Sequence, residues 1–125
     1  MQILVAESDP ATRAALTEAL ERAGASALAA EDGRTALRLA RTVPIDAGII
    51  DVALSDLPGL RLAELLRSIA RVPLLFVGAT ESKEIRLQVA DAGGWSFLPI
   101  PVEPAVVQVT ITVFTRRLSL AQSGN

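Results

Sequence analysis

Strand-type and helix-type segments alternate along the whole chain, and this feature restricts the possible folds most. Short apolar runs predict five strands, at residues 3–6, 26–30, 47–50, 74–77 and 95–98. Helical patterns follow each of them, at about residues 10–23, 34–42, 60–70, 81–92 and 103–118. Such alternation is typical of a parallel sheet that is covered by helices on both faces.

Capping residues mark several of these boundaries. Asp9 and Pro10 read as the N-cap and first-turn proline of the first helix, and Gly24 as its end. The inward positions expected for this helix are Ala14, Leu16, Leu20 and Ala23. In the last segment the β-branched residues between positions 106 and 113 would also suit a strand. We expect a helix there because the run is too long for an ordinary strand and Glu103-Pro104 is a good helix opening.

The composition indicates one cytoplasmic domain. The chain has 125 residues, which we divide into a domain at 1–119 and a polar tail at 120–125. Its start lacks a basic region, so we expect no signal peptide. No apolar stretch approaches the ~20 residues that span a bilayer, which argues against a membrane protein. The net charge of −2 and the scattered arginines argue against nucleic-acid binding by this domain.

Asp51 directly follows the apolar run at 47–50. An acid at the end of a buried strand is costly unless it has a partner. In open α/β sheets this edge is where binding sites are built. The chain has no histidine, no cysteine and no glycine-rich phosphate loop, so a metabolic enzyme is not expected. Asp51 is therefore the leading candidate for a functional residue.

Several motifs, in order, resemble the receiver domains of two-component response regulators. The resemblance covers the chain from Ile3 to about Arg117. The segments that carry it are Ile3-Leu4-Val5-Ala6-Glu7-Ser8-Asp9-Pro10, Asp46–Asp51, Pro58-Gly59, Val72-Pro73-Leu74-Leu75-Phe76-Val77, and Ala92-Gly93 with Pro101. It implies a flavodoxin-like, doubly wound (βα)₅ fold with a five-stranded parallel sheet in the order 2-1-3-4-5.

The resemblance assigns roles to the residues around Asp51. Asp51 matches the aspartate that accepts a phosphoryl group from a phosphohistidine or a small acyl phosphate. Glu7 and Ser8 stand where the family has a pair of acids that bind Mg²⁺. A backbone carbonyl two residues beyond the acceptor, here that of Ala53, completes the family's metal site. Because Ser8 is not a carboxylate, we expect only a weak Mg²⁺ site formed by Glu7, Asp51 and the Ala53 carbonyl.

Other positions of the motif depart from the family. Gly78 replaces the hydroxyl residue that ends the fourth strand, and Ile100 replaces a lysine before Pro101. The only lysine, Lys83, lies beyond the fourth strand, in the wrong element to replace it. A positioned charge contributes about 3–4 kcal/mol to a transition state, so these losses predict phosphoryl transfer slowed by orders of magnitude. Phe97 holds the position of the family's switch aromatic, and the resemblance implies a cis Ile100–Pro101 bond.

These residues are compatible with three functions. The first is an atypical receiver, or pseudo-receiver, that works through protein–protein contacts with weak or no phosphorylation of Asp51. The second is a slow but working phospho-acceptor switch, and the third is a small-molecule sensor with an apolar pocket at Gly78 and Ile100. The histidine kinase or output partner is not identifiable from the sequence.

Two surface features have alternative readings. Val106, Val109 and Val113 on one side of the last helix would serve a homodimer through that helix and the fifth strand, or form a solvated apolar rim. Trp95 and Phe97 are either partner anchors or core residues at the edge of the sheet.

Overall fold

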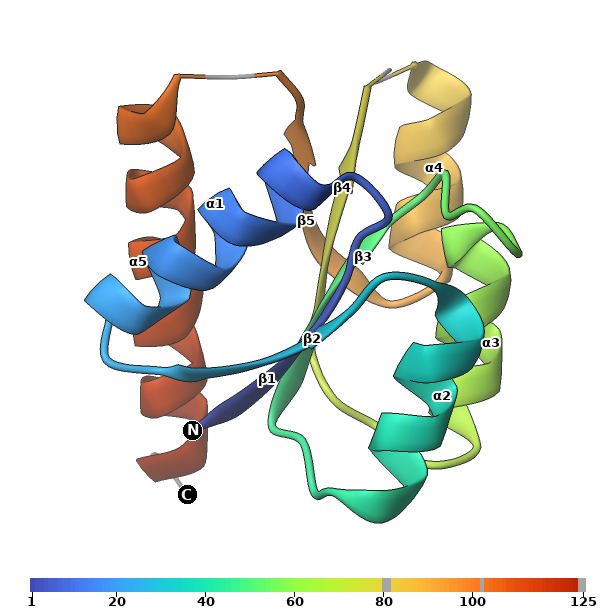
Figure 1. The fold of residues 1–125 in the computed structure, drawn as a ribbon, viewed down its shortest axis with the longest axis horizontal. Coiled ribbons are helices and arrows are strands. Elements are labelled where there is room, and N and C mark those ends of the chain that lie inside the picture. Colours follow the sequence, from blue (N-terminus) through green and yellow to red (C-terminus); the bar gives the residue numbers. More distant parts are fainter. Residues whose placement is uncertain (80–81, 102, 124–125) are drawn as a thin grey trace.

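The computed structural model describes residues 1–79, 82–101 and 103–123. Within them, five parallel strands form one sheet in the order β2-β1-β3-β4-β5 (Figure 1). The strands are β1 (Gln2–Ala6), β2 (Ser26–Ala30), β3 (Ala47–Asp51), β4 (Leu74–Gly78) and β5 (Gly94–Pro99). This topology confirms the flavodoxin-like (βα)₅ prediction.

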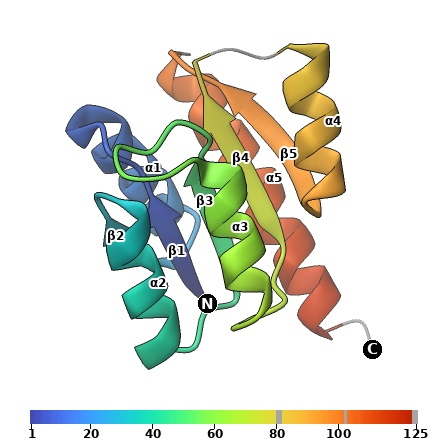
Figure 2. The same cartoon turned by 90° about the vertical axis from the view of Figure 1, so that its right-hand side faces the viewer.

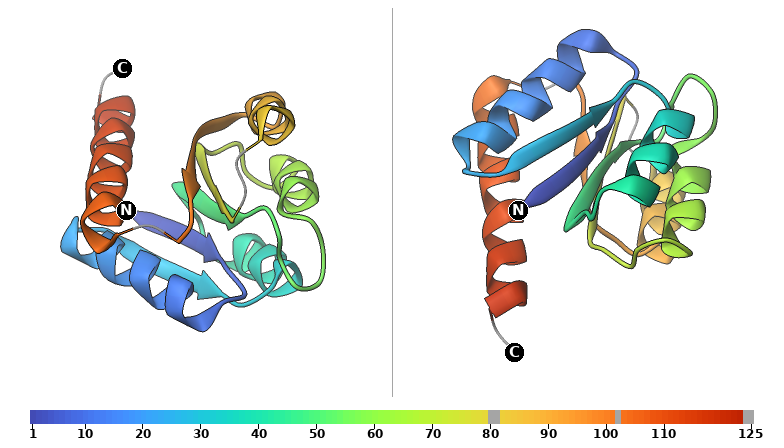
Figure 3. Two further views of the ribbon diagram at one scale, coloured as in Figure 1. Left: turned by 90° about the horizontal axis from the view of Figure 1, so that it is seen from above. Right: turned by 60° about the horizontal axis from the view of Figure 1, so that its bottom comes forward.

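Five helices cover the sheet in two layers. They are α1 (Pro10–Arg22), α2 (Gly33–Thr42), α3 (Gly59–Arg67), α4 (Lys83–Asp91) and α5 (Pro104–Ser123). Helices α1 and α5 lie on one face, and α2, α3 and α4 lie on the other (Figure 3). Each layer encloses its own apolar core, so the sheet is buried on both faces.

Alternate residues of the central strands fill these two cores. Ile49 packs with α1 and α5, whereas its neighbour Ile50 packs with α2 and α3. Every residue of β3 and β4 is buried, as expected for central parallel strands. The edge strand β2 is half-exposed. Asp51 therefore emerges from the most deeply buried part of the molecule.

Several helix boundaries differ from the sequence prediction. Helix α3 ends at Arg67 rather than near Ala70, because the amides of Ser68 and Ile69 bond carbonyls three residues back, those of Leu65 and Leu66, and so leave the helical pattern. Helix α4 begins at Lys83 after its N-cap Ser82, while the expected start at Glu81 lies outside the described residues. Helix α5 continues to Ser123, so residues 120–123 of the expected tail are helical.

The packing of α1 also corrects one expectation. Leu16 and Leu20 are buried as expected, but Ala14 is exposed. Two residues along a helix are about 200° apart around its axis, so Ala14 and Leu16 cannot share one face.

The β-branched last segment is helical, as predicted. Val107, Ile111, Phe114, Thr115 and Leu118 form its buried side. None of the described helices is long and apolar enough to cross a membrane.

Candidate functional site

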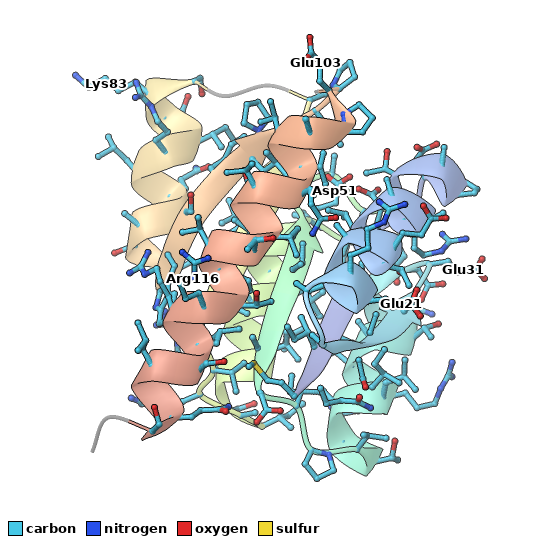
Figure 4. The ribbon with its side chains drawn as sticks, turned by 90° about the vertical axis from the view of Figure 1, so that its left-hand side faces the viewer. Glu21, Glu31, Asp51, Lys83, Glu103 and Arg116 are labelled. Carbon is cyan, nitrogen blue, oxygen red and sulfur yellow. The ribbon has the colours of Figure 1, made fainter. Side chains whose placement is uncertain are left out.

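The candidate site lies at the carboxyl edge of the sheet. Asp51 ends β3 and pairs in register with Val77 of β4, and Glu7 directly follows β1, the neighbour of β3 on its other side. Figure 4 shows Asp51 at this end of the sheet, between α5 and α1. Both carboxyl groups are buried, with Glu7 1% and Asp51 8% exposed. The predicted pairing of Glu7 and Asp51 is therefore present.

The environment of the two acids favours the binding of one proton by Glu7. Burial is the largest cause that raises the pKa of Glu7 to about 8, and a hydrogen bond with the Asp51 carboxyl is the second. The Asp9 amide donates to Glu7 Oε2 at 3.1 Å, whereas the buried Glu7 Oε1 accepts no hydrogen bond from the described residues. A protonated Glu7 can donate to Asp51, which explains why the neutral form is favoured.

The raised pKa of Glu7 predicts a pH-dependent stability of the metal-free protein. Between pH 4.5 and about 8 the folded state keeps a proton that the unfolded state releases. The free energy of unfolding should therefore fall as pH rises through this window, by at most ~1.4 kcal/mol per pH unit, and level off above it. Urea denaturation in EDTA at a series of pH values tests this. Glu7→Gln, which mimics the neutral acid, should lack the fall, and a wild-type profile identical to that of the variant would contradict the assignment.

Ser8 and Asp9 are held by local contacts rather than aimed at Asp51. The Ser8 hydroxyl accepts a hydrogen bond from the Ser55 amide at 2.9 Å. Asp9 is the N-cap of α1, as predicted, and accepts from the Thr12 amide and hydroxyl. These bonds, that of the Thr12 hydroxyl first, hold the pKa of Asp9 below its usual value. Asp9 is thus not free to replace the carboxylate missing at Ser8.

Arg13 is a site residue that the sequence reasoning missed. Its Nη1 donates to the Glu7 carbonyl at 2.9 Å and lies 3.4 Å from the Ser8 carbonyl. The side chain therefore holds the turn between β1 and α1 that presents Glu7. No sequence pattern identifies such a contact, because its acceptors are backbone atoms.

The loop after Asp51 is tied to its neighbours. The Ala53 amide donates to Asp51 Oδ1 at 2.7 Å. The Asp56 carboxylate accepts from the amides of Gly33 and Arg34, at the start of α2, at 2.8 and 2.9 Å. Although desolvation raises the pKa of Asp56, these backbone bonds outweigh it and hold the pKa below its usual value. Together with the Ser8 bond to this loop, they fix it between α1 and α2.

The space beside Gly78 is filled by other side chains. A Cβ atom at Gly78 would lie 2.7 Å from Val52 Cγ2 and 3.1 Å from Phe97 Cζ. Phe97 is half-buried against the core under α2, α3 and α4. Val52 and Phe97 therefore lie on the side of Gly78 that a Cβ atom would face, and the small-molecule pocket considered from the sequence stays a prediction. The Phe97 ring occupies part of the space that a side chain at position 78 would need.

Ile100 lies next to the end of β4 and brings no charge. Its amide donates to the Gly78 carbonyl at 2.9 Å, and the Ile100–Pro101 bond is cis, as predicted. Figure 4 shows Lys83 at the exposed end of α4, well away from Asp51. The structure therefore agrees that Lys83 cannot act in place of the lysine missing at position 100.

The donor set falls short of a complete Mg²⁺ site. Glu7 Oε1, Asp51 and the backbone at Ala53 provide oxygen atoms, but the Ser8 hydroxyl is already engaged. No group of three or more acidic side chains that could hold a metal occurs among the described residues. Metal binding would also require Glu7 to lose its proton.

Comparison with known proteins identifies the family. The protein-family model described as the response regulator receiver domain matches residues 3–112. The chain therefore belongs to the receiver-domain family of two-component response regulators. It is 37% identical over 102 residues to the response regulator MprA of Mycolicibacterium vanbaalenii, which covers 81% of this chain and 44% of that protein.

A second relative extends the match along the chain. The identity to the uncharacterized transcriptional regulatory protein YrkP of Bacillus subtilis is 30% over 121 residues, covering 97% of this chain and 52% of that protein. The chain thus spans about half the length of these relatives.

Solved structures agree with this assignment. The non-phosphorylated HemR receiver domain of Leptospira biflexa matches with a TM-score of 0.81 and 28% identity, covering 95% of this chain and 94% of that one. A CheY-like receiver domain protein of Methanospirillum hungatei matches with a TM-score of 0.84 over 99% of this chain and 98% of that one. Its identity is 18%, so it supports the fold alone.

Proposed function

We propose that this receiver domain is atypical and acts in signal transduction through protein–protein contacts, with weak or no phosphorylation of Asp51. The observation that carries the proposal is the filled space beside Gly78. Val52 and Phe97 occupy the volume that a residue able to contact a phosphoryl group at position 78 would require. A phosphoryl group on Asp51 would thus find no side chain at position 78 to move, and Phe97 already occupies the adjoining space.

The charges around Asp51 support the same proposal. Ile100 provides no cation, and the Ser8 hydroxyl is bonded to the loop rather than free for a metal. Phosphoryl transfer depends on electrostatic stabilisation, which this site supplies only in part. Mg²⁺ would bind weakly, through Glu7, Asp51 and the Ala53 carbonyl. We place the domain in the cytoplasm, which suits a chain without cysteine.

The proposal is tested by intact-mass spectrometry after incubation with Mg²⁺ and a small acyl phosphate. The reference is a receiver domain that has both acids after its first strand and the lysine before the proline. In the time that fully labels this reference, we expect little or no phosphoryl adduct on the wild type. Asp51→Asn is the matched control, because it keeps the size of the side chain and removes the nucleophile. Rapid formation of one adduct on the wild type but not on the variant would establish a working phospho-acceptor switch instead.

A further inference from the structure

A hollow lies at the edge of the sheet where the strands begin, opposite the edge that carries Asp51. It is bounded by the end of α3, the loop at 68–73, the start of β4 and the turn between α4 and β5. Figure 2 looks onto this face of the sheet and shows β4 between α3 and α4. The volume of the hollow, about 410 Å³, falls within the range of small-molecule sites. The hollow is therefore separate from the site that contains Glu7 and Asp51.

The inner wall of this hollow is apolar. Ala63, Leu66 and Leu74 line it, are buried, and belong to the core under α2, α3 and α4. Val72 and Pro73 add half-buried apolar surface beside them. Covering such surface is favourable, so the wall suits a ligand that has an apolar body.

The charged side chains that line the hollow are both arginines. Arg67, at the end of α3, and Arg71, in the loop that follows, are exposed, and neither forms an ion pair with a described residue. Glu64 and Asp91 line a neighbouring hollow with Arg67, but Glu64 is paired with Arg61 at 2.8 Å. Two guanidinium groups without carboxylate partners beside one hollow favour an anion there.

The fold holds Arg67 against the turn between α4 and β5. Its Nη2 atom lies 3.5 Å from the Asp91 carbonyl oxygen, and a Cβ atom at Gly93 would lie 3.2 Å from the same nitrogen. Gly93 has a φ of +81°, which is typical of the residue after a helix. A guanidinium group has five N–H donors, so this one long hydrogen bond leaves most of them available to a ligand.

We propose that this hollow binds a small organic carboxylate with an apolar body. The carboxylate would accept hydrogen bonds from Arg67 and Arg71, because the planar guanidinium group matches its two oxygens. The apolar body would cover Leu66, Val72 and Leu74. The C-terminal ends of α3 and α4 border the hollow, and their partial negative charge favours a singly charged carboxylate over a doubly charged phosphate.

The inference goes beyond the proposed function and does not depend on it. The residues that line the hollow are distinct from Glu7, Asp51 and the other residues of the candidate functional site. Ligand binding at the hollow and phosphorylation of Asp51 are therefore measured separately, and the failure of one proposal leaves the other standing.

An NMR titration of the whole chain tests the proposal. The probe is 4-phenylbutyrate, and the two control compounds are 4-phenylbutanol, which lacks the charge, and inorganic phosphate, which lacks the apolar body. The Gly93 amide and the indole N–H of Trp95, the only tryptophan, report binding because both residues line the hollow. We expect 4-phenylbutyrate to bind at least about tenfold more tightly than either control, the lower end of what a hydrogen bond to a charged group contributes.

Substitutions locate the binding. Arg67→Gln and Arg71→Gln should each weaken binding of 4-phenylbutyrate about tenfold. Ala70→Leu adds volume at a half-buried position of the lining and should weaken it as well. Arg41→Gln, at an exposed arginine of α2, is the matched control and should leave the affinity unchanged.

Four outcomes overturn the proposal. The first is no binding of 4-phenylbutyrate at millimolar concentration, and the second is an affinity that both arginine substitutions leave unchanged. The third is equal binding of the probe and either control compound. The fourth is a set of shifts confined to Gly78, Phe97 and Ile100, which would place the ligand in the pocket predicted beside Asp51 instead.

Discussion

Replacing Gly59 with alanine should lower the free energy of unfolding by about 3 kcal/mol or more, the upper end of what overpacking costs. A Cβ atom at this position would overlap the Asp51 carbonyl oxygen and would lie 2.8 Å from Val52 Cα. Both neighbours are backbone atoms of the strand end that carries the candidate acceptor, and the Gly59 amide bonds the Val52 carbonyl. Neither can yield without moving β3 or α3.

Urea denaturation of Gly59→Ala beside Gly24→Ala separates steric overlap from backbone strain. Gly24 has a φ of +84° and no atom within 4 Å of its would-be Cβ, so its substitution should cost only about 1–2 kcal/mol. If Gly59→Ala proves no more destabilising than Gly24→Ala, α3 does not pack against the end of β3 as described.

Restoring the missing charges should accelerate phosphorylation of Asp51 by about 100-fold or more, the effect of a single well-placed electrostatic group. The double variant Ser8→Asp with Ile100→Lys supplies a third carboxylate for Mg²⁺ and the absent cation. An aspartate at position 8 can still accept the Ser55 amide bond that Ser8 accepts now. The rate of adduct formation with acyl phosphate, followed by intact mass, gives the measurement.

A charge-free double variant controls for changes in shape. Ser8→Asn with Ile100→Met alters the same positions without adding charge and should leave labelling at the wild-type level. Gly78→Thr is omitted because Val52 and Phe97 occupy the space of its side chain. Unchanged labelling of the charged variant would show that electrostatics alone does not limit this site.

The five strands and the position of Asp51 were predictable from the residues alone, and the order of the strands followed from the resemblance to receiver domains. Apolar runs, caps such as Asp9 and stops such as Gly24 act over a few residues, so they can be recognised in the chain itself. The pairing of Glu7 with Asp51 followed from the resemblance to receiver domains, and it fits the sheet because the neighbouring parallel strands β1 and β3 end at the same edge. The contacts of the surrounding loops did not follow.

Gly59 shows this difference clearly. In the sequence, Pro58-Gly59 indicated a turn, yet the structure places Gly59 in the first turn of α3, where the Asp51 carbonyl leaves no room for a side chain. Two hydrogen bonds likewise join residues far apart in the chain, the one between Ser55 and Ser8 and the one from the Gly33 amide to Asp56.

The sequence by itself determined the alternation of strands and helices and the position of Asp51, because periodicity and residue type are local properties. The resemblance to receiver domains added the strand order, the acidic pair and the missing charges. Only the tertiary structure decided that Val52 and Phe97 fill the space at Gly78, and that two arginines border an apolar hollow at the edge where the strands begin. These outcomes depend on how side-chain volumes from separate strands and helices meet, and that depends on the register and packing of the whole domain.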